Sequence, residues 1–150
     1  MSTSSVLFDT NVLVYNQDKD SSYYKDAYFY HKKVFKGEFQ GVIAVQNFLE
    51  FSAVITSPFH VIRPLSVKSA TLEIEKYQSN DTFHIIYPND STISVFLDLL
   101  RKYKVRNSKH VFDVFLVATM LSNHIDTILT ANVKDFVFNE IKTIKLTSNK

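Results

Sequence analysis

Three carboxylates stand where the sequence is otherwise hydrophobic. Asp9 ends one apolar run, Glu50 interrupts a second, and Asp113 interrupts a third. A buried carboxylate is costly unless it takes up a proton, finds a partner or binds a metal ion. Mg²⁺ and Mn²⁺ prefer oxygen ligands, so one divalent cation would explain all three positions at once. The acids therefore predict a shared metal site.

Each acid taken alone has a simpler explanation. Asp9 could cap a following helix, Glu50 could lie at the rim of an imperfectly amphipathic helix, and Asp113 could pair with Lys109 one turn earlier. Together these explanations need three unrelated accidents. A joint site is therefore the better hypothesis.

More polar side chains follow an apolar run that ends at Thr130. Asn132 and Asp135 come directly after it, and their oxygen atoms could complete a metal cluster. Asn132 could equally be a helix N-cap, with Asp135 at the third helical position, where the helix dipole favours an acid. The sequence is compatible with both the metal-binding and the helix-capping interpretation.

Basic residues precede the third acid. Lys104, Arg106 and Lys109 could offset the repulsion between an acidic pocket and a phosphate backbone, or they could be solvated charges of a loop and a helix start. His110 lies three residues before Asp113, and we interpret it as a surface histidine rather than a catalytic base.

The elements that must position these residues alternate between short strands and helical patterns. Strands are predicted at 6–8, 41–45, 83–88, 127–130 and 143–146, and helical spacing occurs within 16–37, 46–55, 66–79, 90–104 and 108–121. The helix over 90–104 is expected to turn Ile93, Phe96, Leu97 and Leu100 inward. This alternation predicts a parallel sheet covered by helices on both faces, with its site at the carboxyl ends of the strands.

Composition limits the remaining classes. At 150 residues, 45% of them hydrophobic, the chain is expected to form one folded domain over residues 1–150. The absence of cysteine excludes disulfides, thiolate nucleophiles and cysteine-bound metals. No stretch resembles a signal peptide or a membrane span, so we expect a cytoplasmic protein. A net charge of +2 does not by itself indicate a nucleic-acid partner.

Four segments together resemble a known family. VLFDTNVLVY, VQNFLEFSAVI, HVFDVFLVATML and TANVKDF are similar, in this order, to the PIN-domain ribonucleases, and most similar to the VapC-like toxins of type II toxin–antitoxin pairs. The resemblance covers nearly the whole chain. It implies a three-layer, Rossmann-like α/β/α sandwich with a parallel sheet of about five strands.

The resemblance also implies a function and a site. Mg²⁺ or Mn²⁺ would be bound by Asp9, Glu50 and Asp113, which would be the catalytic residues of a metal-dependent endoribonuclease. An RNA substrate, a cognate antitoxin and a homodimer are implied as well, with no membrane partner. The supporting polar groups of the pocket would be Thr10, Asn11, Thr130, Asn132 and Asp135.

Asn132 is a departure from the family pattern, because many members carry a fourth acid at this position. A PIN-fold RNA-binding or assembly protein with weak or lost turnover is therefore the alternative. A phosphatase of the haloacid-dehalogenase type is a third possibility. It requires a second acid two residues after the first, where this chain has Asn11.

Overall fold

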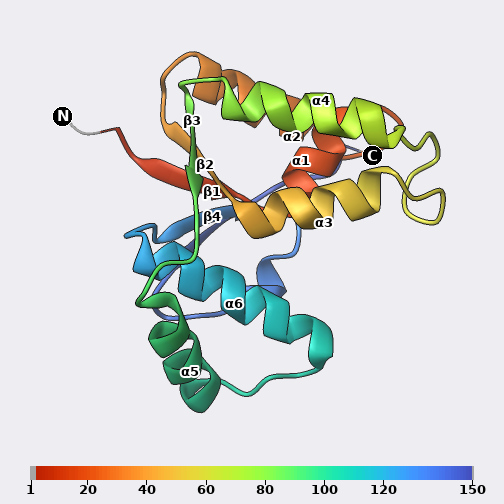
Figure 1. Ribbon diagram of the computed structural model, residues 1–150. Coiled ribbons are helices and arrows are strands. Elements are labelled where there is room, and N and C mark those ends of the chain that lie inside the picture. Colours follow the sequence, from red (N-terminus) through yellow and green to blue (C-terminus); the bar gives the residue numbers. More distant parts are fainter. Residues whose placement is uncertain (1–2, 150) are drawn as a thin grey trace.

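The computed structural model describes residues 3–149, and its centre is one parallel sheet. The strand order is β3-β2-β1-β4-β5. The chain therefore starts in the middle, winds outward to β3, and then crosses to β4 on the other side of β1 (Figure 1). The strands are β1 Ser5–Phe8, β2 Gln40–Ala44, β3 Phe83–Ile86, β4 Thr127–Thr130 and β5 Lys142–Lys145.

Helices cover both faces of this sheet. In Figure 1 α1 to α4 lie on one side of the strands, and α5 and α6 lie on the other. The α/β/α sandwich predicted from the sequence is thus confirmed. No helix within residues 3–149 is long and apolar enough to cross a membrane. The helices are α1 Thr10–Gln17, α2 Tyr24–Phe35, α3 Val45–Ile55, α4 Val67–Gln78, α5 Thr92–Lys102 and α6 Ser108–Ser122, followed by the 3₁₀ turn η1 Val133–Asp135.

Successive strand residues bury opposite faces of the sheet. Phe8, Ile43 and Leu129 belong to the core on the side of α1 to α4, whereas Leu7 and Ile128 belong to the core beneath α5 and α6. Side chains alternate along a strand, so a sheet covered on both faces needs continuous apolar runs. These short runs meet that need, and they bring the carboxyl ends of β1 and β4 side by side.

The inward face predicted for α5 is partly wrong. Ile93 and Leu97 are 57% and 42% exposed, whereas Leu99 is buried. Thr92 fixes the rotation of the helix, because it is buried and shares a hydrogen bond of 2.7 Å with the Ser122 hydroxyl on α6. The apolar stripe of α5 is wider than the surface that α6 covers, so hydrophobic spacing alone could not select the buried residues.

Candidate functional site

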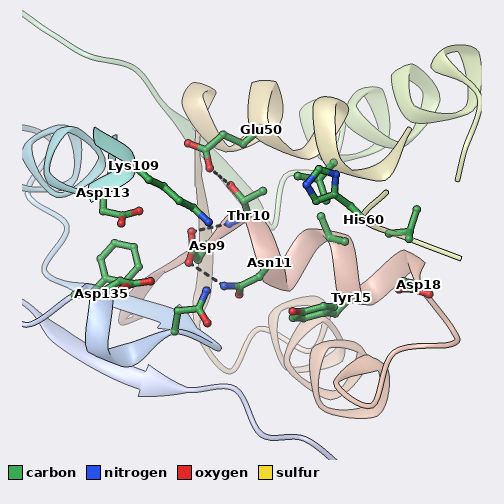
Figure 2. A pocket seen from close by; sticks show the side chains of 15 residues that line it. Asp9, Thr10, Asn11, Tyr15, Asp18, Glu50, His60, Lys109, Asp113 and Asp135 are labelled. Atoms are coloured by element: carbon green, nitrogen blue, oxygen red, sulfur yellow. Dashed lines mark hydrogen bonds between the residues drawn. The ribbon is translucent and has the colours of Figure 1, made fainter. Parts of the chain in front are cut away.

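Three distant acids lie around one pocket beyond the carboxyl ends of β1 and β4. Asp9 directly follows β1, Glu50 lies on α3, Asp113 lies on α6, and all three line a cavity of about 280 Å³ (Figure 2). Asp135, at the end of η1, is a fourth acid on its wall. This edge is where open α/β sheets place their sites, at the point where the strand order reverses.

Asp9 both caps a helix and faces the pocket. Its Oδ1 accepts a hydrogen bond of 2.8 Å from the backbone N–H of Thr10, at the start of α1. Its Oδ2 accepts hydrogen bonds from the Thr130 hydroxyl at 2.7 Å and the Asn11 side-chain amide at 3.1 Å. The capping explanation and the site explanation therefore describe the same side chain, held by three donors.

Glu50 is oriented by a chain of polar contacts. Its Oε2 accepts a hydrogen bond of 3.0 Å from the Thr10 hydroxyl, which itself accepts one of 3.1 Å from the Asn47 amide. Its Oε1 accepts a hydrogen bond of 2.8 Å from the Gln46 amide, which also donates to the backbone carbonyl of Phe112. The carboxylate of α3 is thereby tied to both α1 and α6.

The electrostatics of the pocket favour protons on two of the acids. Burial, together with the negative charges of Asp9, Asp135 and Glu50, raises the pKa of Asp113 to about 7, and Lys109 opposes this rise. Burial also raises the pKa of Asp9 to about 6, although the hydrogen bonds that it accepts lower it. Negative charge is therefore crowded here, and a cation would relieve it.

The side chains of Asn132 and Asp135 do not make the contacts expected if their only role were to cap a helix. Asp135 accepts a hydrogen bond of 2.8 Å from the Arg106 guanidinium, which balances its charge. Asn132 occupies the N-cap position of η1, but its side chain makes no capping hydrogen bond and lines the pocket instead. Its backbone N–H donates to the Thr130 hydroxyl at 3.0 Å.

Only one of the three basic residues lines the pocket. Lys109 points into the pocket in Figure 2, whereas Lys104 and Arg106 line a separate hollow with His110. His110 is only 8% exposed, so its interpretation as a surface histidine is wrong. Its ring lies near that of Phe138 and lines this second hollow rather than the acidic pocket.

Comparison with known proteins gives the fold a name. No family model and no curated protein sequence matches the chain. Among solved structures, the VapBC2 complex of Rickettsia felis, bound to a DNA fragment from its promoter, has a TM-score of 0.67 at 13% identity over 95% of this chain and 99% of the other. VapBC-1 of nontypeable Haemophilus influenzae has a TM-score of 0.62 at 16% identity, over 96% and 99%.

A third structure is VapC20 of Mycobacterium tuberculosis, a sarcin-ricin loop cleaving toxin. It has a TM-score of 0.64 at 9% identity over 91% of this chain and 98% of that one. The chain has the PIN-domain fold of the VapC toxins. At these identities the likeness establishes the fold, which confirms the architecture that the sequence resemblance implied.

The donors of this PIN domain have the chemistry for a hard cation but are not gathered around one point. Asp9, Glu50, Asp113 and Asn132 all offer oxygen, the ligand type of Mg²⁺ and Mn²⁺. Within residues 3–149, however, no three acidic or histidine side chains converge closely enough to form a ready-made metal site.

The PIN-domain pocket also has an end that sequence reasoning missed. The helical spacing from Asn11 to Tyr15 could have placed Tyr15 on the pocket side of α1. His60 lies in the loop between α3 and α4, and no local pattern marks it. Tyr15, Asp18 and His60 lie at this end in Figure 2, and Val14, Val54 and Val61 also line the pocket.

Proposed function

We propose that this chain is a Mg²⁺- or Mn²⁺-dependent endoribonuclease that hydrolyses RNA phosphodiester bonds and is the toxin of a toxin–antitoxin pair. The observation that carries the proposal is the meeting of Asp9, Glu50 and Asp113 on one pocket, where burial and mutual repulsion raise the pKa of two of them. The VapC fold supports it, since one solved neighbour is a toxin that cleaves the sarcin-ricin loop.

In this proposal the side chains of the pocket have separate roles. Asp9, Glu50 and Asp113 would hold the ion, with Asn132 at the pocket wall. A bound ion would polarise a phosphoryl oxygen of the substrate and lower the pKa of a water molecule. Thr10 keeps the Asp9 and Glu50 carboxylates in fixed relation through the two hydrogen bonds that it donates. Lys109, the cation on the same wall, would offset the charge of the approaching phosphate.

The partner in this proposal is a cognate antitoxin. Solved structures of the same fold include toxin–antitoxin complexes, which supports an antitoxin as the class of protein partner. A homodimer is proposed from the family resemblance. Light scattering of the purified chain, alone and with the product of any small neighbouring gene, tests both assemblies.

Cleavage of single-stranded and structured RNA by the purified protein tests the activity. We expect cleavage with Mg²⁺ or Mn²⁺, and its loss in Asp9→Asn. Asp98→Asn is the matched control, because Asp98 is an exposed acid on α5 that pairs with Arg101. Cleavage that persists in excess chelator, or that is unchanged in Asp9→Asn, would contradict the proposal.

A PIN-fold RNA-binding protein without turnover is the second candidate. Two observations favour it: Asn132 stands where a fourth acid would strengthen ion binding, and the acids of residues 3–149 are not gathered into a ready-made metal site. Tight RNA binding without cleavage in either metal would select this candidate. RNA cleavage that depends on Asp9 would exclude it.

A further inference from the structure

The active-site pocket continues beyond the acids into an aromatic end. In Figure 2 Tyr15 and His60 lie on the opposite side of the pocket from Asp113. Val14 and Val61, which also line the pocket, directly adjoin Tyr15 and His60 in the chain, so this end offers rings and methyl groups rather than a cluster of charges. Asp18 is the carboxylate at this end. The two ends are therefore chemically distinct parts of one cavity.

Tyr15 is held in a defined orientation. It follows Asn11 by four residues, so both side chains lie on one face of α1 and are separated by roughly 6 Å along the axis. Its ring stacks on Tyr23 with centroids 4.7 Å apart and an interplanar angle of 13°. The Tyr15 ring is thus held at a fixed distance from Asn11, whose side-chain amide donates a hydrogen bond to Asp9.

His60 is carried by a loop that is anchored on both sides. Its backbone N–H donates to the Ser57 carbonyl at 3.1 Å, and the next residue, Val61, is buried in the core. Further along, Arg63 forms an ion pair of 3.1 Å with Asp20, beyond the end of α1. These anchors present an exposed imidazole above α1 without burying it.

We propose that the end of the pocket formed by Tyr15, His60 and Asp18 binds the base of the nucleotide next to the scissile phosphate, and favours a base with an amino group over uracil. The proposal rests on the proposed ribonuclease function. Aromatic rings stack on the faces of unpaired bases, and sequence-specific RNA recognition targets such bases. A carboxylate accepts a hydrogen bond from the cytosine amino group, whereas it repels a phosphate, so Asp18 selects the base rather than the backbone for this end.

Nucleotide binding tests the subsite without requiring turnover. Cytidine 5′-monophosphate, uridine 5′-monophosphate and ribose 5-phosphate are titrated in Mg²⁺ into the full chain, with NMR signals of His60 and Tyr15 as the readout. We expect cytidine 5′-monophosphate to bind at least about tenfold more tightly than ribose 5-phosphate, because base stacking supplies the difference. Equal affinities for these two, or no measurable binding of the nucleotide, would overturn the proposal.

Single substitutions show which residues contribute to nucleotide affinity and to the preference for cytidine. His60→Ala is expected to lose roughly tenfold in affinity for cytidine 5′-monophosphate, whereas His84→Ala, at an exposed histidine on β3, keeps it. Asp18→Asn is expected to remove the preference for cytidine over uridine. Tyr15→Leu repeats the test on the opposite wall, with a thermal melt to establish folding. Unchanged affinity in His60→Ala, or no cytidine preference in the parent chain, would overturn the proposal.

Cleavage assays of the same variants separate this proposal from the function on which it rests. The parent chain could cleave RNA while nucleotide affinity depends neither on the base nor on His60 and Asp18. In that case the ribonuclease function stands and the proposed base-binding site is wrong. If the nucleotide binds as expected and no RNA is cleaved in Mg²⁺ or Mn²⁺, the subsite stands and turnover fails. In an active enzyme, His60→Ala should raise KM and leave kcat nearly unchanged, since stacking on a neighbouring base is uniform binding.

Discussion

The buried region around His31 and the acidic pocket both hold ionisable groups, and the cost of burying those groups is met in opposite ways. In the core on the side of α1 to α4, His31 on α2 packs against Phe8 and lies next to Tyr77. Its Nδ1 donates to the Ala27 carbonyl at 2.8 Å, so Nε2 must accept the hydrogen bond of 2.7 Å from the Tyr77 hydroxyl. Burial lowers the pKa of His31 to about 4, and the ring stays neutral.

The acidic pocket leaves its charges crowded instead. Asp9 accepts three hydrogen bonds and its pKa is still raised to about 6, because burial outweighs them. The histidine pair is complete within the protein, whereas the carboxylates have capacity for an external cation. We infer from this difference that the first region serves stability and the second serves function.

The largest expected effect is the loss of cleavage in Asp113→Asn. If Asp113 binds the ion as proposed, its replacement should lower the rate of RNA cleavage by at least about 100-fold. The same change should stabilise the ion-free protein at pH 8, because it removes one of the mutually repelling charges. Initial rates in Mn²⁺ and urea unfolding without metal measure the two effects. An inactive variant that is also less stable would mean that Asp113 is mainly a structural residue.

His31→Ala should lower stability and leave RNA cleavage unchanged, which is the reverse of the effects expected for Asp113→Asn. We expect it to lower the free energy of unfolding by about 2–4 kcal/mol, since it leaves a cavity and an unpaired Tyr77 hydroxyl. Cleavage below the unfolding temperature should stay near that of the parent chain. Tyr77→Phe removes only the hydroxyl and should cost about 1 kcal/mol. Loss of cleavage in a folded His31→Ala protein would break the division between the two regions.

The pH dependence of stability separates the regions further. His31 binds a proton more readily when unfolded, so its contribution falls by about 3 kcal/mol as the pH drops from 6.5 to 4. Asp9 binds a proton more readily when folded, so its contribution falls by about 2 kcal/mol as the pH rises from 4 to 6. The two effects oppose each other in the parent chain.

Urea unfolding of single variants between pH 4 and 7 resolves these opposing terms. Stability should fall with decreasing pH more steeply in Asp9→Asn than in the parent chain. In His31→Gln it should instead rise with decreasing pH, because only the acids remain. Parallel pH profiles for both variants would show that these groups do not differ as described.

Asn132→Asp is expected to have the smallest effect, and it tests the acidic pocket by adding a charge instead of removing one. An added acid at the pocket wall should cost about 0.5–1 kcal/mol of stability without metal, through repulsion from its neighbours. It should also strengthen Mn²⁺ binding, because it supplies another charged oxygen ligand. Calorimetric titration of both proteins with Mn²⁺ measures the difference. Weaker ion binding in the variant would show that residue 132 does not face the ion.

The sequence could predict the sheet and the acids for a common reason. Parallel strands buried on both faces need unbroken apolar runs, and an acid inside or at the end of such a run stands out, as Asp9 and Asp113 do. The parallel sheet and its two helical layers are confirmed, whereas the roles of Asp9, Glu50 and Asp113 stay predictions until they are measured. Asp9 follows the end of β1, whereas Glu50 and Asp113 lie within α3 and α6, so their common pocket depends on how these helices pack.

What the sequence could not predict depends on tertiary contacts. The Arg106–Asp135 pair joins residues 29 positions apart, and the burial of His110 depends on where Phe138 packs. Likewise, Leu97 matches the helical spacing of a buried residue but remains exposed, because α6 covers only part of α5. Residues such as His60, on a loop, reach the pocket through anchors elsewhere in the fold.

Mn²⁺ titration calorimetry in two buffers of different ionisation enthalpy at pH 6.5 tests the central claim most directly. Asp9 and Asp113, with pKa values raised to about 6 and 7, are partly protonated at this pH, and an ion that they bind must displace those protons. We predict saturable binding with proton release that diminishes at pH 8.5, and loss of both in Asp9→Asn. Binding without proton release, or binding that is equal in Asp9→Asn, would contradict the account.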